Sequence, residues 1–227
     1  LGFCGGYNAA LKKIKASRYV LLNSDVEVTP NWLVPMEHVL DRFTEVAAVQ
    51  PKVLAERQRD HFEYAGAGGG LIDTMGYPFC RGRIFGDIEK DEGQYNNVIP
   101  AFWSSGAAMM IRSSVFHETG GFDPVFFAHM EEIDLCWRIR NRGYEIMCIP
   151  DSVVYHVGGA TLPKNNPGKT KLNFRNNLSM MYKNLPLLQL VPVLLIRLML
   201  DGVAGVKFLI EGGPADWIKI EFPLCSL

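Results

Sequence analysis

The stretch YVLLNSDVE, residues 19–27, decides the fold. Its first four residues are apolar without interruption, which is typical of a strand buried in a parallel sheet. Two carboxylates, Asp25 and Glu27, follow that strand. Ligands of open α/β sheets bind outside the carboxyl ends of the strands, and alternate residues of extended backbone face the same way. The stretch therefore predicts an α/β sheet with Asp25 and Glu27 side by side at its ligand-binding edge.

The neighbouring sequence continues the alternation of strand and helix that α/β sheets show. Thr29-Pro30 opens a helix that runs to about Phe43, because Thr caps a helix and Pro suits its first position. An apolar strand follows over residues 46–54. Before this stretch we expect a short helix over 8–15 after a glycine turn. After it we expect a long, partly irregular segment over 56–97, a strand within 101–112, an amphipathic helix over 131–142, a strand over 144–149 and a helix over 171–183.

The composition excludes several classes of protein. The 227 residues suffice for one domain, or one domain with an appendage. The net charge of −1 gives no general attraction to nucleic acid, so no nucleic-acid partner is expected. The five cysteines are scattered without a Cys-x-x-Cys pair, which argues against a zinc knuckle and a disulfide framework and fits a reducing compartment.

The segment over residues 185–210 is strongly apolar but is interrupted by Pro192, Arg197 and Asp201. A membrane span needs about 20 apolar residues with few charges, and residues 187–200 are too few for one. We expect an amphipathic pair of helices that lies on a membrane surface or packs on a partner. The alternative is a core helix of the native protein.

Asp25 and Glu27 supply hard oxygen ligands of the kind that Mg²⁺ or Mn²⁺ prefers when it carries a diphosphate. Such a cation would neutralise the charge that develops on a leaving diphosphate. The alternative is that both residues are ordinary turn residues at the end of a strand. The dipeptide spacing alone favours that alternative, whereas the motifs elsewhere in the chain favour metal binding.

Five short motifs in a fixed order resemble those of a family 2 glycosyltransferase of the GT-A fold, close to the bacterial rhamnosyltransferase-like group. They are CGGYN (4–8), LNSDVEV (22–28), GGFD (120–123), EEIDLCWR (131–138) and YHVGGAT (155–161). The resemblance implies a Rossmann-like mixed sheet flanked by helices. It also implies that the first strands of the family, with the pocket for the nucleotide base, are missing. Residues 1–160 then form a partial catalytic domain and residues 161–227 a C-terminal helical region.

The resemblance further implies an inverting transfer of a sugar, with rhamnose as a candidate, from a nucleotide-diphosphate donor to a saccharide or lipid-linked acceptor. The setting it implies is cell-surface polysaccharide synthesis in the cytoplasm, at the inner face of a bacterial membrane. This chain alone need not be active. One alternative is a non-catalytic module that binds carbohydrate or a partner. Another is a metal-dependent nucleotidyltransferase, but its expected basic, glycine-rich phosphate loop is not found in the sequence.

By resemblance, Glu132 is the base that takes the proton from the acceptor hydroxyl. Glu132 stands where the family usually has Asp, so Glu131 is the alternative base, and Asp134 either orients the site or holds the start of the helix. Acidic residues are also favoured in the first turn of any helix because of its dipole. The pattern around residues 131–134 therefore has a structural explanation as well as a catalytic one.

The remaining candidate residues are assigned to three roles by resemblance. His156 would complete a metal site with Asp25 and Glu27, although a lone His is more often structural. The donor would contact Gly5, Gly6, Asn8, Asn23, Ser24 and Arg175. The acceptor or sugar would contact Trp103, Ser105, Gly106 and Asp123. A core position for Trp103 is nearly as consistent with the sequence as a contact with the sugar is. The GGFD turn is interpreted as structural, with a sugar contact by Asp123 as the alternative.

Overall fold

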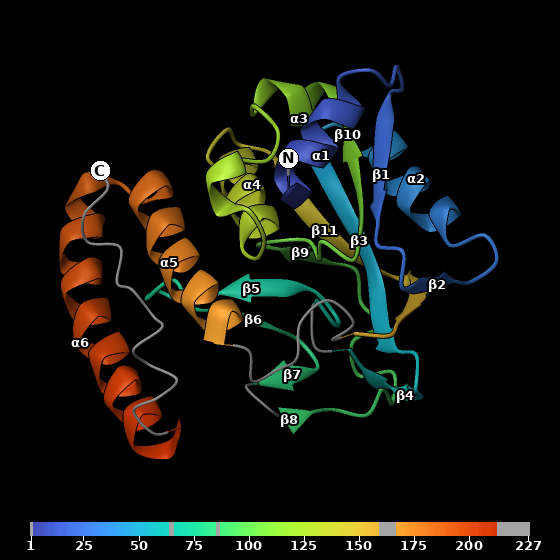
Figure 1. Cartoon of the computed structure of the whole chain (residues 1–227). Coiled ribbons are helices and arrows are strands. Elements are labelled where there is room, and N and C mark those ends of the chain that lie inside the picture. Colours follow the sequence, from blue (N-terminus) through green and yellow to red (C-terminus); the bar gives the residue numbers. More distant parts are fainter. Residues whose placement is uncertain (1, 64–65, 85–86, 159–166, 213–227) are drawn as a thin grey trace.

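The computed structural model describes residues 2–63, 66–84, 87–158 and 167–212. It has a seven-stranded mixed sheet with helices on both faces, and a smaller four-stranded antiparallel sheet at one end of the large one (Figure 1). This architecture confirms the predicted mixed sheet flanked by helices. The end of the YHVGGAT motif after Gly158 and residues 213–227 lie outside the described residues.

The large sheet has the order β1-β10-β3-β11-β2, with β4 added beside β3 and β9 beside β11. Strands β3 and β11 pair in parallel, and the other pairs are antiparallel. The bounds are β1 Arg18–Leu22, β2 Val26–Val28, β3 Val46–Ala55, β4 Gln58–Phe62, β9 Ile99–Ala101, β10 Ala108–Arg112 and β11 Glu145–His156. Strand β3 is buried along almost its whole length, as its apolar sequence predicts.

The hydrophobic core has two parts, one on each face of the large sheet. Helix α2 (Leu33–Arg42) places Met36 and Leu40 on one face. Helices α3 (Ser113–Glu118) and α4 (Glu131–Arg140) cover the other face. The helix expected from Thr29 begins instead at Leu33, because the Thr29 hydroxyl donates to the Val153 carbonyl across the β2–β11 pair.

Helix α1 (Gly2–Leu11) begins earlier than the sequence predicts. Gly5 and Gly6 lie inside this helix, so the predicted glycine turn before it is wrong. Glycine costs about 1 kcal/mol in a helix interior. Packing offsets that cost, because Phe3 and Tyr7 contact the ring of Phe122.

The stretch over residues 56–97 is more regular than expected. Beyond β4 it forms the small antiparallel sheet of strands β5 (Gly70–Ile72), β6 (Pro78–Cys80), β7 (Arg83–Ile84) and β8 (Asp87–Ile88). Gly76 and Gly82 adopt positive φ angles of 77° and 87° in its turns, which most other residues adopt only with strain. The glycines that suggested irregularity therefore make tight turns.

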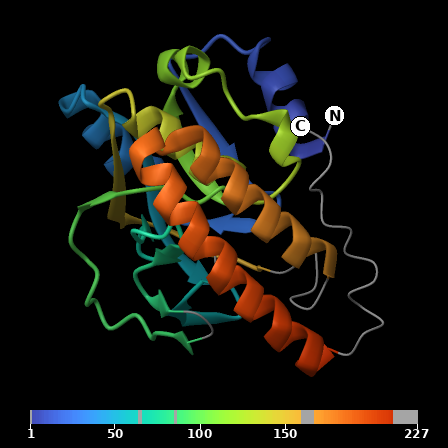
Figure 2. The ribbon, with the colours of Figure 1, turned by 90° about the vertical axis from the view of Figure 1, so that its left-hand side faces the viewer.

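Helices α5 (Pro167–Asn184) and α6 (Leu187–Gly212) lie side by side on one flank of the molecule (Figures 1 and 2). α6 is one helix with Pro192 inside it, so the predicted pair of helices is wrong. Leu187–Val206, with a mean hydropathy of 1.9, is long and apolar enough to cross a membrane by length and composition. That stretch is longer than the one judged too short from the sequence.

Candidate active site

Asp25 and His156 meet at one end of the large sheet. Asp25 lies in the turn between β1 and β2, and His156 is the last residue of β11. The Asp25 Oδ1 atom lies 3.2 Å from the His156 Nε2 atom. Two of the three residues assigned to a metal site are therefore brought together.

Glu63 joins this pair, and the sequence analysis missed it. Its Oε2 atom lies 3.4 Å from the His156 Nδ1 atom, and its side chain is 7% exposed. A Cβ atom on Gly158 would lie 2.5 Å from the Glu63 Oε1 atom, so only glycine permits this approach. No local pattern marks Glu63, since it is placed by the hydrogen bond from its amide to the Val53 carbonyl on β3.

The imidazole of His156 is mostly buried between two carboxylates. Burial alone lowers the pKa of a histidine. Here Glu63 and Asp25 outweigh the effect of burial, so the pKa of His156 is raised above its usual value.

Glu27 does not join this group. Its carboxylate pairs with the Arg59 guanidinium at 2.7 Å, and that guanidinium lies 4.4 Å from the centre of the Tyr155 ring. Tyr155 is the cross-strand neighbour of Glu27, and adjacent residues of a strand face opposite sides. Glu27 thus lies on the other face of β2–β11 from His156. The expectation that Asp25 and Glu27 face the same way fails because Asp25 belongs to a turn, not to extended backbone.

A second acidic group lies at the start of α4. Glu131 and Glu132 occupy its first turn, and each has a buried carboxylate oxygen with no hydrogen-bond partner. A Cβ atom on Gly106 would lie 3.7 Å from the Glu132 Cβ and Cγ atoms. The structure therefore brings together Glu132, assigned as base, and Gly106, assigned to the sugar or acceptor.

Burial raises the pKa of Glu131, and the negative charge of Glu132 raises it further. Burial also raises the pKa of Glu132. A carboxylate whose pKa is moved toward neutrality is a better proton acceptor than an ordinary surface Glu. The two residues thus have the electrostatic property that a general base requires.

The segment that leads into α4 is strained. Phe127, His129 and Met130 have positive φ angles of 62°, 68° and 68°, which cost free energy in residues other than glycine. The buried Asn176 amide nitrogen lies 3.0, 2.9 and 2.7 Å from the carbonyl oxygens of Phe126, Ala128 and His129. Asn176 on α5 therefore holds the segment in the shape that places Glu131 and Glu132.

Arg175, the neighbour of Asn176, was assigned to the donor. Its Nη2 atom donates to the carbonyls of Val125 and Phe126 at 3.1 and 3.2 Å. These contacts support the same segment as Asn176 does. The structure thus places Arg175 at the segment before α4 instead of beside Asp25 and His156.

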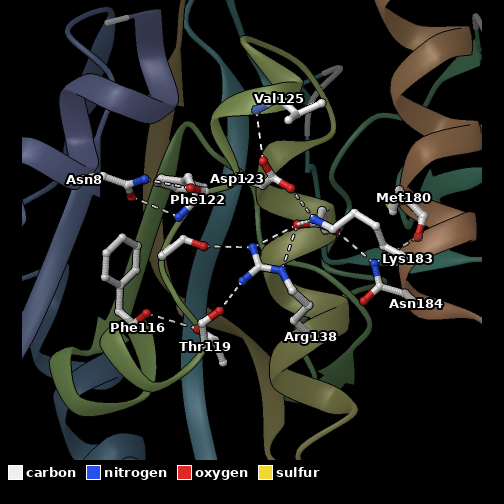
Figure 3. Close-up of polar contacts among 12 residues, drawn as sticks. Asn8, Phe116, Thr119, Phe122, Asp123, Val125, Arg138, Met180, Lys183 and Asn184 are labelled. Carbon is white, nitrogen blue, oxygen red and sulfur yellow. Dashed lines mark hydrogen bonds and ion pairs between the residues drawn. The ribbon is translucent and has the colours of Figure 1, made fainter. Parts of the chain in front are cut away.

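Asp134 and Asp123 both make hydrogen bonds within the protein, and Figure 3 shows Asp123 beside Lys183 and Val125. Asp134 is fully buried and accepts hydrogen bonds from Arg138 at 2.8 Å, Asn184 at 2.9 Å and Lys183 at 3.0 Å. Asp123 accepts from the Val125 amide at 2.9 Å and pairs with Lys183 at 2.7 Å. Both aspartates join α4 to α5 and to the turn before α4, which agrees with the structural alternatives considered for them.

Asn8 makes two hydrogen bonds with the backbone of Phe122, at 2.7 and 3.0 Å (Figure 3). Its amide group is therefore committed to joining α1 to the GGFD turn. Gly5 and Gly6 lie in the same helix. Of the residues assigned to the donor, Asn23 and Ser24 lie in the turn beside Asp25.

Trp103 and Ser105 are core residues in this structure. The Trp103 ring is 5% exposed, donates to the Leu71 carbonyl at 2.8 Å and packs so closely on Gly70 that a Cβ atom there would lie 2.2 Å away. The Ser105 amide donates to Gln50, and its hydroxyl accepts from the Ala107 amide. The surfaces needed to stack on a sugar are thus covered, and the structure favours the core alternative for Trp103.

Comparison with known proteins shows which family this chain belongs to. The pattern of the family described as Glycosyltransferase like family 2 matches residues 2–178. This chain belongs to that family. The match includes Asp25, Glu63, the start of α4 and His156, so this family 2 chain carries both acidic groups within the matched region.

Curated relatives of this family 2 chain include sugar transferases. The chain is 26% identical over 144 residues to N-acetylglucosaminyl-diphospho-decaprenol L-rhamnosyltransferase of Mycobacterium tuberculosis, covering 60% of this chain and 46% of the relative. It is 29% identical over 160 residues to the O-antigen biosynthesis protein RfbC of Myxococcus xanthus, covering 68% and 12%. It is 38% identical over 48 residues to the rhamnosyltransferase WbbL of Escherichia coli, covering 21% and 18%. The matches thus span less than half of each of these relatives.

A solved structure shares the fold. The crystal structure of GalNAc-T7 with UDP, GalNAc and Mn²⁺ superposes with a TM-score of 0.56 and 15% sequence identity, covering 80% of this chain and 34% of that protein. At this identity the likeness shows the fold alone. The family 2 chain thus has the GT-A fold expected from its motifs.

Proposed function

We propose that this glycosyltransferase transfers a sugar by a single displacement with inversion, and that Glu132 is its general base. The observation that supports the proposal most is the first turn of α4. There Glu132 lies against Gly106, has a buried oxygen without a partner and has a raised pKa.

In the proposed step, an acceptor hydroxyl lies beside Glu132 in the room that Gly106 leaves. The hydroxyl oxygen attacks the anomeric carbon of the donor sugar and gives its proton to the Glu132 carboxylate. The bond from the anomeric carbon to the diphosphate breaks, and the diphosphate leaves with the bonding electrons. Burial and the negative charge of Glu132 raise the pKa of Glu131, which remains the alternative base.

The donor diphosphate is proposed to lie near Asp25 and His156. Their carboxylate and imidazole groups, 3.2 Å apart, are suitable ligands for Mg²⁺ or Mn²⁺. Glu63 lies at the other ring nitrogen of His156, and among the described residues no three His, Cys, Asp or Glu side chains are arranged to hold a metal ion together. The remaining ligands would therefore come from the diphosphate and water. When bound, the cation would stabilise negative charge on the leaving diphosphate.

For the substrates, we propose a rhamnosyl donor and a saccharide or lipid-linked acceptor. The names of the relatives from M. tuberculosis and E. coli support this choice, since both are rhamnosyltransferases. We propose that the protein works in cell-surface polysaccharide synthesis at the cytoplasmic face of a bacterial membrane. The outward apolar side chains of α6 support a membrane contact.

The test compares Glu132→Gln with Glu131→Gln in the full-length protein. Glu132→Gln is expected to lower kcat at least 100-fold, because general bases contribute about 10²–10⁴-fold, and to leave the KM of the donor nearly unchanged. Glu131→Gln, the matched control, should keep most of its turnover. A loss in Glu131→Gln alone would move the base by one residue, and full activity in both variants would contradict the proposal.

A further inference from the structure

A groove of about 500 Å³ lies where α6 begins. One side is the turn between β5 and β6, over residues 73–76, and the opposite side is the first two turns of α6. Its apolar walls are formed by Ile72, Trp137, Leu185, Leu188, Pro192 and Val193. The volume lies within the range of ligand sites, and most of the lining is apolar, with Asp73, Thr74 and Gln189 as its polar members.

The groove continues into the outward face of α6. Leu188 belongs to both, since it lines the groove and is 92% exposed. Further along the helix, Val191, Leu195, Leu198 and Val203 are each more than half exposed. The stretch Leu187–Val206 extends over about 30 Å, at 1.5 Å per residue, which is close to the thickness of the hydrocarbon layer of a bilayer.

Both ionisable side chains in Leu187–Val206 are turned toward the protein. Arg197 is 1% exposed, lies 3.5 Å from the centre of the Tyr77 ring and donates to the Met75 carbonyl. Asp201 accepts from the Tyr77 hydroxyl at 2.9 Å. Protein interfaces have a polar rim, whereas this face presents hydrocarbon along its length. Its composition therefore fits lipid better than a protein partner.

Trp137 lines the groove and lies on the same helix as the candidate base. It lies on α4, five residues after Glu132, or about 7.5 Å along the helix axis. A lipid-linked sugar acceptor has its sugar and its hydrocarbon chain on opposite sides of a phosphate group. Its two ends thus need sites of opposite polarity, and α4 contributes Glu132 to one and Trp137 to the other.

We propose that the groove binds the hydrocarbon chain of a lipid-linked acceptor and that this chain reaches it from the membrane along the outward face of α6. The inference rests on the proposed glycosyl transfer to a lipid-linked acceptor. It adds a second contact to that acceptor, which selects for the presence and length of the chain.

The test uses photolabelling of the full-length protein in detergent micelles. The probe is a long-chain prenyl-diphosphate-linked sugar with a diazirine on its chain, and labelled peptides are identified by mass spectrometry. Labels are expected within residues 72–76 and 185–193. Val193→Trp fills the groove and should reduce labelling there roughly tenfold, because the chain loses several buried methylene groups. Val203→Trp, the same change on the outward face of the same helix, should leave it unchanged.

Two additions keep the test decisive. Leu188→Asn alters a side chain that is 92% exposed, so it should weaken labelling without harming the fold, with Val34→Asn on the exposed surface of α2 as its control. Unlabelled acceptor should compete with the probe, whereas excess phosphatidylglycerol should not. Equal labelling in Val193→Trp and Val203→Trp, or equal competition by phospholipid, would overturn the proposal.

Kinetics separate this inference from the proposed function. The KM of a long-chain acceptor should rise roughly tenfold in Val193→Trp, while that of a short-chain acceptor stays the same. If both acceptors react with unchanged KM, the groove proposal fails and glycosyl transfer stands. If no acceptor reacts but the labelling follows the expected pattern, glycosyl transfer fails and chain binding stands.

Discussion

The first turn of α4 holds three carboxylates in two contrasting environments. Glu131 and Glu132 each have a buried oxygen without a hydrogen-bond partner. Asp134 follows two residues later, is fully buried and accepts from Arg138, Lys183 and Asn184. Donors stabilise the charged form of a carboxylate, and burial without donors favours the protonated form. One helical turn thus contains a structural carboxylate beside two that are suited to accept protons.

The largest expected effect comes from removing Asp134. Asp134→Ala leaves Arg138 and Lys183 without their shared buried partner, and such losses cost about 3–5 kcal/mol. The free energy of unfolding, measured by urea titration, should fall by that amount. Glu132→Ala is the matched control, because it removes a side chain without a comparable set of donors. Equal destabilisation by the two changes would abolish the contrast between these carboxylates.

Asn176→Ala tests how the segment before α4 is held. The carbonyls of Phe126, Ala128 and His129 lose the amide that bonds to them, so we expect a loss of about 2 kcal/mol in stability. We also expect a fall in kcat with little change in the KM of the donor. Asn177→Ala is the control, since Asn177 is equally buried on the same helix but bonds to the Gly76 carbonyl at 2.8 Å. It should lower stability without lowering kcat. A similar fall in kcat in both variants would mean that only general stability matters.

The smallest expected effect is a pH-dependent gain in the stability of the Glu131→Gln variant. Folding raises the pKa of Glu131 above its usual 4.5, so the folded state binds more protons and loses stability as the pH rises from about 5 toward 8. Glu131→Gln removes this loss. Its melting temperature should match that of the wild type at pH 5 and exceed it at pH 8. At pH 8 its free energy of unfolding should be higher by about 1 kcal/mol. An equal difference at both pH values would contradict the raised pKa.

The sequence predicts the features that depend on local pattern. The EEIDLCWR motif forms a helix with its acids in the first turn. The apolar run before Asp25 forms a strand, but the predicted burial in a parallel sheet is wrong, because β1 is an antiparallel edge strand with Val20 and Leu22 exposed. Glu63 could not be found in this way, because its place beside His156 depends on how β4 pairs with β3. The contact of Glu27 with Arg59 likewise depends on tertiary structure. Local signals thus indicate the acidic centres, but only the packed fold shows which carboxylates converge.

The hold of α5 on the segment before α4 has a consequence for biosynthesis. Asn176 follows His129, whose carbonyl it binds, by 47 residues. On the ribosome, the strained segment emerges well before the helix that stabilises it. Contacts between distant parts of a chain form late, because the loop between them must first be closed. The acidic turn would therefore reach its folded shape only after α5 has been synthesised and docked. A nascent chain that ends before α5 would lack an ordered first turn of α4.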